Sequence, residues 1–208
     1  MILEAKEVSY FYKSQKDKLI LDHINYGFAC GKIYAILGPS GSGKTTFLSL
    51  LAGLDMPAEG EICYNGKAIT TSGLAEHRRH HVSLVFQSYN LIDYLTPLEN
   101  VKLGGKKSPD VLLNSVGIAK ELWGRSVLQL SGGQQQRVAI ARALASNATV
   151  LLADEPTGNL DEATAWDVID LLKHIAHDEN KCVIVVTHSK ELAAEADAVI
   201  QIKDLAQP

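Results

Sequence analysis

The sequence contains little cysteine and has no strong excess of charge. Its 208 residues include three cysteines, which stand far apart at Cys30, Cys63 and Cys182. Zinc sites and disulfide frameworks need closely spaced cysteines, so we expect ordinary buried thiols in a reducing compartment. The formal net charge is −4, which gives no general attraction to a polyanion. We therefore expect no nucleic-acid partner.

Long apolar runs are also missing. No run approaches the roughly 18 residues of a membrane span, and the start, MILEAKEVSY, carries charges where a signal peptide needs an apolar core. We expect that the chain does not cross a bilayer by itself. The densest basic run, HRRHH at residues 77–81, is short, and we interpret it as a solvated surface. Without an internal repeat or long linker, residues 1–208 are predicted to form a single domain.

Three short apolar runs predict buried strands at residues 33–37, 149–153 and 182–186. The second and third are separated by residues 162–177, which read as an amphipathic helix. Trp166, Ile169, Leu172 and Ile175 recur on one face of that helix, and we expect all four in the core. Because a strand, helix, strand order implies a parallel sheet, the fold class is α/β. Residues 46–52 predict another helix, which Gly53 ends.

The pattern changes between residues 88 and 130, where polar turns such as GGKKSP alternate with short helical runs such as 111–116. We interpret residues 88–130 as an inserted helical subdomain. Residues 1–87 and 131–208 then form the core.

A glycine-rich segment, GPSGSGKT at residues 38–45, satisfies the pattern G-x-x-x-x-G-K-[ST] between a predicted strand and a predicted helix. Glycines let consecutive backbone N–H groups turn toward one anion, and the helix N-terminus adds its dipole. We predict that Lys44 bridges the β- and γ-phosphates of a nucleotide and that the Thr45 hydroxyl holds Mg²⁺. The predicted nucleotide-binding residues are Gly38, Pro39, Ser40, Gly41, Ser42, Gly43, Lys44, Thr45 and Thr46.

Polar residues follow the other two predicted strands. Asp154 ends the strand at 149–153 and is a candidate Mg²⁺ ligand, because magnesium prefers hard oxygen ligands on a rigid element. Glu155 beside it is the candidate base for an attacking water. His188 follows the strand at 182–186, where its imidazole is predicted to stabilise charge on the γ-phosphate. These three residues and the lysine of the loop form one predicted catalytic group.

Two further segments carry a specific family resemblance. LSGGQQQRVAIARAL at residues 130–144 resembles the signature of ATP-binding cassette (ABC) ATPases, and VLLADEPTGNLD at 150–161 resembles their Walker B and D-loop segments. The resemblance implies a P-loop NTPase with a mostly parallel sheet, an N-terminal antiparallel β subdomain and an inserted α-helical subdomain, which hydrolyses ATP with Mg²⁺. The signature is a second anion-binding nest at a helix start, formed by Ser131, Gly132, Gly133 and Gln134.

The resemblance also implies a homodimer. Each ATP would lie between the Gly38 loop of one chain and the Ser131 helix of a head-to-tail partner, with Asp161 of the D-loop at the interface. Gln87 matches the Q-loop residue that reaches Mg²⁺ and the attacking water. Tyr12 matches the aromatic residue that stacks on adenine, with Tyr10 and Phe11 as the open alternatives.

Within the family, the segments GPSGSGKTT and VFQSYNLIDYLTPLENV are most similar to the branch that serves macrolide export, lipoprotein release and antimicrobial-peptide resistance. This implies a subunit at the cytoplasmic face of the membrane that drives a separate membrane permease subunit through the Gln87 loop. Several apolar and aromatic residues follow Gln87, and two interpretations of them stay open: they line a groove that docks the membrane subunit, or they belong to the core of the subdomain. These residues are Tyr89, Leu91, Ile92, Tyr94 and Leu95. The rival hypotheses are a soluble ABC ATPase without a membrane partner and a small P-loop kinase, and a kinase has no use for the LSGGQ segment.

Overall fold

The computed structural model describes residues 1–12 and 19–205. It contains two sheets. One has four antiparallel strands in the order β2-β1-β4-β5. The other has five strands in the order β6-β7-β8-β3-β9, and each neighbouring pair is parallel. The predicted α/β class, with a parallel sheet and an antiparallel sheet, is therefore confirmed.

The strands are short, and most connections in the parallel sheet pass through helices. The strand bounds are β1 Leu3–Phe11, β2 Leu19–Phe28, β3 Lys32–Leu37, β4 Glu59–Tyr64, β5 Lys67–Ala68, β6 Val82–Val85, β7 Val150–Asp154, β8 Cys182–Thr187 and β9 Ala198–Gln201. The helix bounds are α1 Lys44–Leu51, α2 Leu74–Glu76, α3 Pro97–Gly104, α4 Pro109–Ser115, α5 Gly132–Leu144, α6 Glu162–His177 and α7 Lys190–Ala194. Short 3₁₀ turns cover Thr71–Gly73, Lys120–Leu122, Val127–Gln129 and Ile202–Asp204, and a single π turn covers His77–His81.

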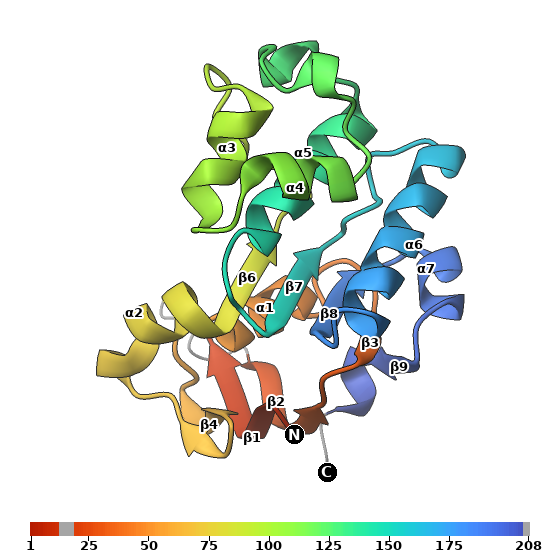
Figure 1. The fold of residues 1–208 in the computed structure, drawn as a ribbon. Coiled ribbons are helices and arrows are strands. Elements are labelled where there is room, and N and C mark those ends of the chain that lie inside the picture. The colour runs from red at the N-terminus through yellow and green to blue at the C-terminus, as the bar shows by residue number, and fades with distance from the viewer. Residues whose placement is uncertain (13–18, 206–208) are drawn as a thin grey trace.

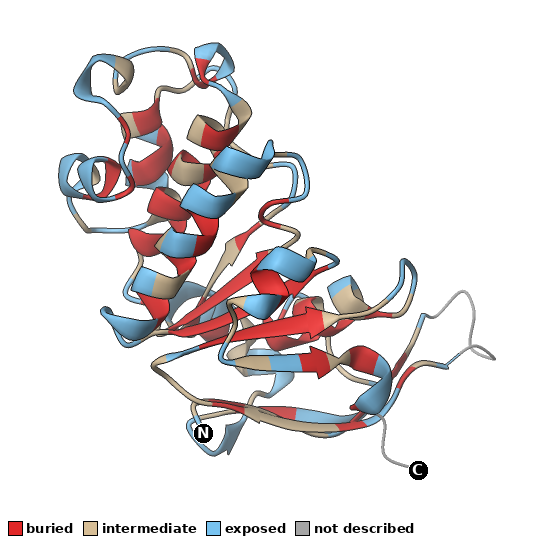
Figure 2. Cartoon of the chain, turned by 90° about the vertical axis from the view of Figure 1, so that its right-hand side faces the viewer, coloured by how far each residue is buried: buried red, intermediate tan, exposed pale blue. Residues whose placement is uncertain are grey.

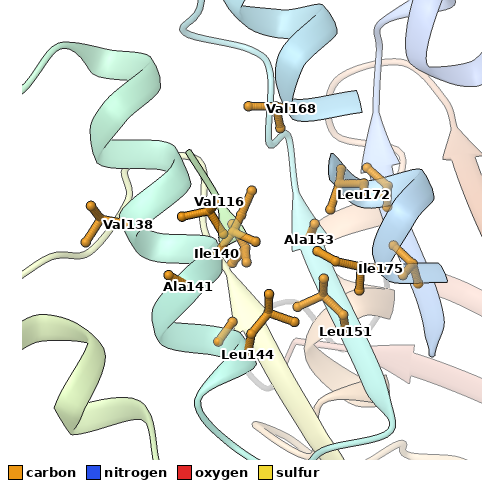
Figure 3. Close-up of a cluster of buried hydrophobic side chains, with 14 of the residues drawn as sticks. Val116, Val138, Ile140, Ala141, Leu144, Leu151, Ala153, Val168, Leu172 and Ile175 are labelled. Carbon is orange, nitrogen blue, oxygen red and sulfur yellow. The ribbon is translucent and has the colours of Figure 1, made fainter. Parts of the chain in front are cut away.

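The parallel sheet separates two hydrophobic cores, because neighbouring residues of a strand point to opposite faces. In β7, Leu151 and Ala153 pack with α5 and α6, whereas Val150 and Leu152 pack with α1 and the antiparallel sheet. Figure 3 shows the first core, in which α5 and α6 meet across β7. Figure 2 shows the buried strands running through the middle of the molecule with exposed helix faces outside. The ends of the parallel strands are thereby held in fixed positions.

Helices α3, α4 and α5 form a layer of their own above β6 and β7 (Figure 1). Helix α5 contacts both α3 and α4, and two glycines bring the chain of α3 close to α5. A Cβ on Gly104 would lie 1.9 Å from the Arg142 carbonyl oxygen, and one on Gly105 would lie 2.0 Å from that of Ala145. Helix α4 begins at Pro109, ahead of the predicted start at 111. The division of the chain at residues 88 and 131 stays a prediction.

One core prediction is wrong. Helix α6 spans Glu162–His177 as expected, but Trp166 is 38% exposed. The buried arc runs through Val168, Ile169, Leu172 and Ile175. At about 100° per residue, Trp166 lies six residues before Leu172 and therefore about 120° away around the helix, outside the arc.

The basic run at His77–His81 is not solvated throughout. His77 is 1% exposed, because its ring packs between the end of α1 and Tyr64 of β4. A buried imidazole needs hydrogen-bond partners, and Nε2 of His77 lies 2.9 Å from the Leu51 carbonyl oxygen. The interpretation of this run as a solvated surface is wrong for His77. Cys63 and Cys182 are buried and Cys30 is half-buried, all with free thiols.

Among the helices within the described ranges, none combines the length and apolar character that a membrane span requires.

Candidate functional site

The glycine-rich loop connects β3 to α1 in a conformation that few residues other than glycine adopt. Gly41 and Gly43 have φ angles of 78° and 93°, in the left-handed region. A Cβ at Gly43 would also lie 3.2 Å from the Ile20 carbonyl oxygen. The Lys44 ammonium donates hydrogen bonds to the carbonyls of Gly38 and Pro39, at 2.7 and 3.2 Å. The loop therefore curls around its own lysine at the N-terminus of a helix, a position where the backbone N–H groups and the helix dipole favour an anion.

Two side chains with oxygen atoms of the kind that a hard cation prefers lie next to each other at this loop. Asp154 is the last residue of β7, and the Thr45 hydroxyl at the start of α1 donates to its Oδ1 atom at 3.3 Å. Burial raises the pKa of the Asp154 carboxyl above its ordinary value, and the hydroxyl hydrogen bond opposes this shift. A partly desolvated carboxylate is stabilised by a cation. The pair fits Mg²⁺, which takes one or two protein oxygens together with phosphate oxygens and water.

Glu155 has a left-handed backbone, with a φ angle of 45°, which costs a residue other than glycine about 1–3 kcal/mol. Its carboxylate Oε2 accepts hydrogen bonds from the Thr187 hydroxyl at 3.1 Å and the His188 N–H at 3.2 Å. Nδ1 of His188 lies 2.9 Å from the same oxygen. The Glu155 side chain is 13% exposed and that of His188 is 70% exposed. A shielded carboxylate thus contacts an imidazole that is open to solvent.

The loop after β6 reaches the segment that follows Glu155. The Asn159 side chain donates to the Gln87 carbonyl oxygen at 3.2 Å. A Cβ on Gly158 would lie 3.3 Å from Nε2 of Gln87, so the Gln87 amide lies against this turn. Gln87 itself is exposed. The carboxyl ends of β6, β7 and β8 therefore meet at one edge of the sheet, together with the loop after β3.

Asp161 has a clear local role as the N-cap of α6. Its Oδ1 accepts from the Thr164 N–H at 3.0 Å and its Oδ2 from the Thr164 hydroxyl at 2.7 Å. These hydrogen bonds lower the pKa of the Asp161 carboxyl. Such a cap stabilises the start of a helix, because it satisfies backbone N–H groups that have no partner within the helix.

The LSGGQ segment begins α5 with a reciprocal capping box. The Ser131 hydroxyl accepts from the Gln134 N–H at 3.3 Å, and the Gln134 side chain accepts from the Ser131 N–H at 3.0 Å. Gly133 is needed because a Cβ there would lie 1.9 Å from Cγ2 of Thr164. Within the described residues, residues 131–134 form no hydrogen bond with the glycine-rich loop. The structure leaves these two nests unconnected within one chain.

The three candidate aromatic residues of β1 and its end lie differently. Tyr10 is buried, and its hydroxyl donates to Asp55 at 2.6 Å. Phe11 is half-buried. Tyr12 is 45% exposed, and its hydroxyl lies 2.8 Å from Oγ1 of Thr46 in α1. Of the three, Tyr12 is the most exposed residue, and its hydroxyl contacts the helix that follows the glycine-rich loop.

A cavity of about 530 Å³ opens beside Glu155 and His188, and Trp166 lines it. The helical periodicity of 162–177 contained no signal for this cavity, because periodicity does not show which other segments lie beside the helix. Arg142 of α5 was also missed. Its guanidinium donates to the carbonyls of Tyr89 and Asn90, the first at 3.0 Å and the second at 2.6 Å. Of the residues around that loop, Tyr94 is 85% exposed and Leu91 packs against the core.

Comparison with known proteins identifies close relatives. The sequence profile of the family described as ABC transporter matches residues 21–158. The chain is 46% identical over 211 residues to the uncharacterized ABC transporter ATP-binding protein YclH of Bacillus subtilis, covering 97% of this chain and 93% of YclH. It is 35% identical over 219 residues to the lipoprotein-releasing system ATP-binding protein LolD of Acinetobacter baylyi, covering 98% of this chain and 96% of LolD.

A solved structure agrees in fold. The ATP-binding cassette MJ0796 of Methanocaldococcus jannaschii, a dimer in a post-hydrolysis state with ADP and Pi bound, superimposes with a TM-score of 0.84. It shares 36% sequence identity with this chain, and the alignment covers 96% of this chain and 94% of MJ0796.

Proposed function

Because the chain belongs to the ABC transporter family as an ATP-binding subunit and ATPase, we propose that the residues at the ends of its parallel strands form one half of a composite ATP site. The observation that supports this most directly is the juxtaposition of Asp154 with Thr45 and of Glu155 with His188. All four lie at the carboxyl edge of the sheet, where α/β proteins bind their ligands.

In the proposed reaction, water attacks the γ-phosphorus of ATP and the bond to the ADP oxygen breaks. Glu155 accepts the proton of the water, and its bonds to Thr187 and His188 hold the carboxylate in place. His188 and Lys44 donate to oxygens of the transferred phosphoryl group, where negative charge gathers. Thr45 and Asp154, with Gln87 from the neighbouring loop, would hold Mg²⁺, which neutralises phosphate charge when bound. Tyr12 stacks on the base.

The second half of the site comes from another copy of the chain. The N-terminus of α5 can offer the Ser131 hydroxyl and the backbone N–H groups of Gly132 and Gly133 to a γ-phosphate, and within the described residues it forms no hydrogen bond with the glycine-rich loop of its own chain. We propose that two chains pair head to tail, each placing residues 131–134 over the nucleotide of the other, with Asp161 near the interface. ATP then stabilises the dimer, and hydrolysis releases it.

The partner that receives this motion is proposed to be a separate membrane permease subunit. Support comes from the loop that follows Gln87, which contacts both the 155–160 turn and α5 and also exposes Tyr94 on the surface. We propose that a change at the nucleotide moves this loop and that the exposed aromatic ring of Tyr94 contacts the partner. LolD is the ATP-binding protein of a lipoprotein-releasing system. We propose the same kind of role here, at the cytoplasmic face of the membrane, in export, lipoprotein release or peptide resistance.

Glu155→Gln tests the catalytic assignment. The amide keeps the shape of the side chain but is not a base, so we expect ATPase turnover to fall by at least about 100-fold while ATP binding persists. Because the bound ATP is not consumed, the variant is expected to elute as a dimer in size-exclusion chromatography with Mg-ATP. Glu162→Gln is the matched control, since Glu162 lines the same cavity and is expected to retain turnover.

Normal turnover in Glu155→Gln would remove Glu155 as the base. A variant that binds ATP but stays a monomer at high concentration would reject the composite site.

Co-purification with a membrane protein tests the proposed membrane partner. Purification without such a protein from a membrane extract would favour a soluble ABC ATPase.

A further inference from the structure

Two histidine side chains face each other away from the proposed ATP site. His77 and His81 begin and end the π turn that follows α2. Their Nδ1 atoms lie 3.3 Å apart. Figure 1 shows α2 and this turn at the edge of the molecule, between the hairpin of β4 and the start of β6. The sequence alone indicated only a short basic run here.

Each imidazole also makes a second contact that fixes its orientation. Nε2 of His77 lies 2.9 Å from the Leu51 carbonyl oxygen, which accepts only from a protonated nitrogen. The neutral ring of His77 therefore carries its proton on Nε2 and presents the lone pair of Nδ1 to His81. The His81 ring stacks on Tyr64, with centroids 3.9 Å apart and planes 6° from parallel. Both rings are oriented before any ligand arrives.

This arrangement has the features of a metal-binding pair. A histidine that ligates a metal generally donates its other N–H to a carbonyl or carboxylate, as His77 does. Two nitrogens at 2.0–2.1 Å from a tetrahedral ion lie about 3.3–3.4 Å apart, and the Nδ1 atoms of this pair match that spacing.

The surroundings have room for the other ligands of an ion. A cavity of about 420 Å³ adjoins both histidines, and its polar lining includes Asn65, Thr70 and Glu76. Within the described residues there is no group of three or more His, Cys, Asp or Glu side chains around one point. Two imidazoles would therefore bind the ion, and water from the cavity would complete its coordination.

We propose that His77 and His81 form a binding site for a divalent first-row transition ion such as Zn²⁺, for which imidazole is a preferred ligand. The ion would connect three segments: the end of α1 through the Leu51 carbonyl, the β4 hairpin through Tyr64, and the turn that leads into β6 and Gln87. The site is separate from the residues assigned to ATP.

The test uses the full chain, purified with a chelator and then freed of it, and titrated with Zn²⁺ in excess Mg²⁺ without nucleotide. Wild type is expected to bind one equivalent of Zn²⁺. The Kd of His81→Gln for Zn²⁺ is expected to be at least 10-fold higher. His81 is chosen because it is half-buried and tolerates change better than the fully buried His77. His80→Gln is the matched control, since His80 is exposed in the same turn, and it is expected to bind as wild type does.

A second readout reports the ligands themselves. Co²⁺ in place of Zn²⁺ is expected to give the strong visible absorption of a tetrahedral site in wild type and His80→Gln, and not in His81→Gln. Zn²⁺ is also expected to raise the Tm of the first two proteins only. Equal Zn²⁺ affinity in His80→Gln and His81→Gln, or no saturable binding in wild type, would overturn the proposal and leave the pair as a neutral Nδ1–H···Nδ1 hydrogen bond.

Discussion

At the scale of single residues, buried polar groups without partners mark positions where the chain gives up stability. Gln136 in α5 is fully buried, and neither Oε1 nor Nε2 of its amide has a hydrogen-bond partner among the described residues. Its neighbour Gln135 donates to the Leu130 carbonyl at 3.0 Å. Leaving a buried amide unpaired costs about 1–3 kcal/mol.

Gln136→Met is therefore expected to raise the free energy of unfolding by about 1 kcal/mol, because methionine has nearly the same volume and no polar atoms. Urea unfolding measures the change. Gln135→Met serves as the comparison and is expected to lower stability, since it removes a hydrogen bond. A loss of more than about 1 kcal/mol in Gln136→Met would mean that the amide has a partner after all.

At the scale of elements, α5 links two parts of the proposed mechanism. Its N-terminus presents the LSGGQ segment, and Arg142 near its C-terminus holds the carbonyls of Tyr89 and Asn90. Both of these residues have left-handed backbones, with φ angles of 59° and 49°. Such conformations persist only where contacts hold them. Arg142 is therefore a positioning residue for the loop after Gln87.

Arg142→Met is expected to release this loop, because it keeps the apolar stem of the side chain and removes both donors. Amide hydrogen exchange at residues 88–91 should become at least 10-fold faster, with little change in the strands of the core. Arg137→Met in the same helix is the control, as Arg137 pairs with the exposed Asp167 at 3.2 Å. Unchanged exchange in Arg142→Met would show that the loop is held by other contacts.

At the scale of the whole molecule, the folded state makes two histidines harder to protonate than they are in the unfolded chain. Burial lowers the pKa of His77 and His81 below the ordinary value of 6.5. The unfolded chain therefore binds more protons than the folded chain in the range below about pH 6.5, and stability rises with pH through that range. The contribution of these residues is fully present above pH 6.5 and is lost as the pH falls.

In metal-free buffer, the free energy of unfolding is thus expected to drop between neutral pH and about pH 5.5. A double variant, His77→Gln with His81→Gln, should show a smaller drop than wild type, and His80→Gln should show the same drop as wild type. Urea titrations at the two pH values measure this. An equal drop in the double variant would place the pH dependence on other groups.

Much of the architecture could be predicted from local pattern. The glycine-rich loop lies between a strand and a helix as expected. Its position could be predicted because the left-handed φ angles at residues 41 and 43 favour glycine, and glycines are easily recognised in the sequence. Helix α6 has the predicted bounds, since caps and periodicity are local properties. Trp166 and His77 were misplaced because exposure depends on what the rest of the fold puts beside a residue. Periodicity and charge density contain no information on such neighbours.

The sequence by itself determined the family and the strand–helix–strand order that implies a parallel sheet. It also determined the candidate chemistry of Lys44, Asp154, Glu155 and His188. These features depend on motif spacing and turn residues, which are properties of consecutive residues in the chain. Only the tertiary structure decided which groups meet: His188 with Glu155, Arg142 with the loop after Gln87, and His77 with His81. The physical reason is that such contacts form where separate segments pack, through side-chain geometry and burial that no single stretch of sequence specifies.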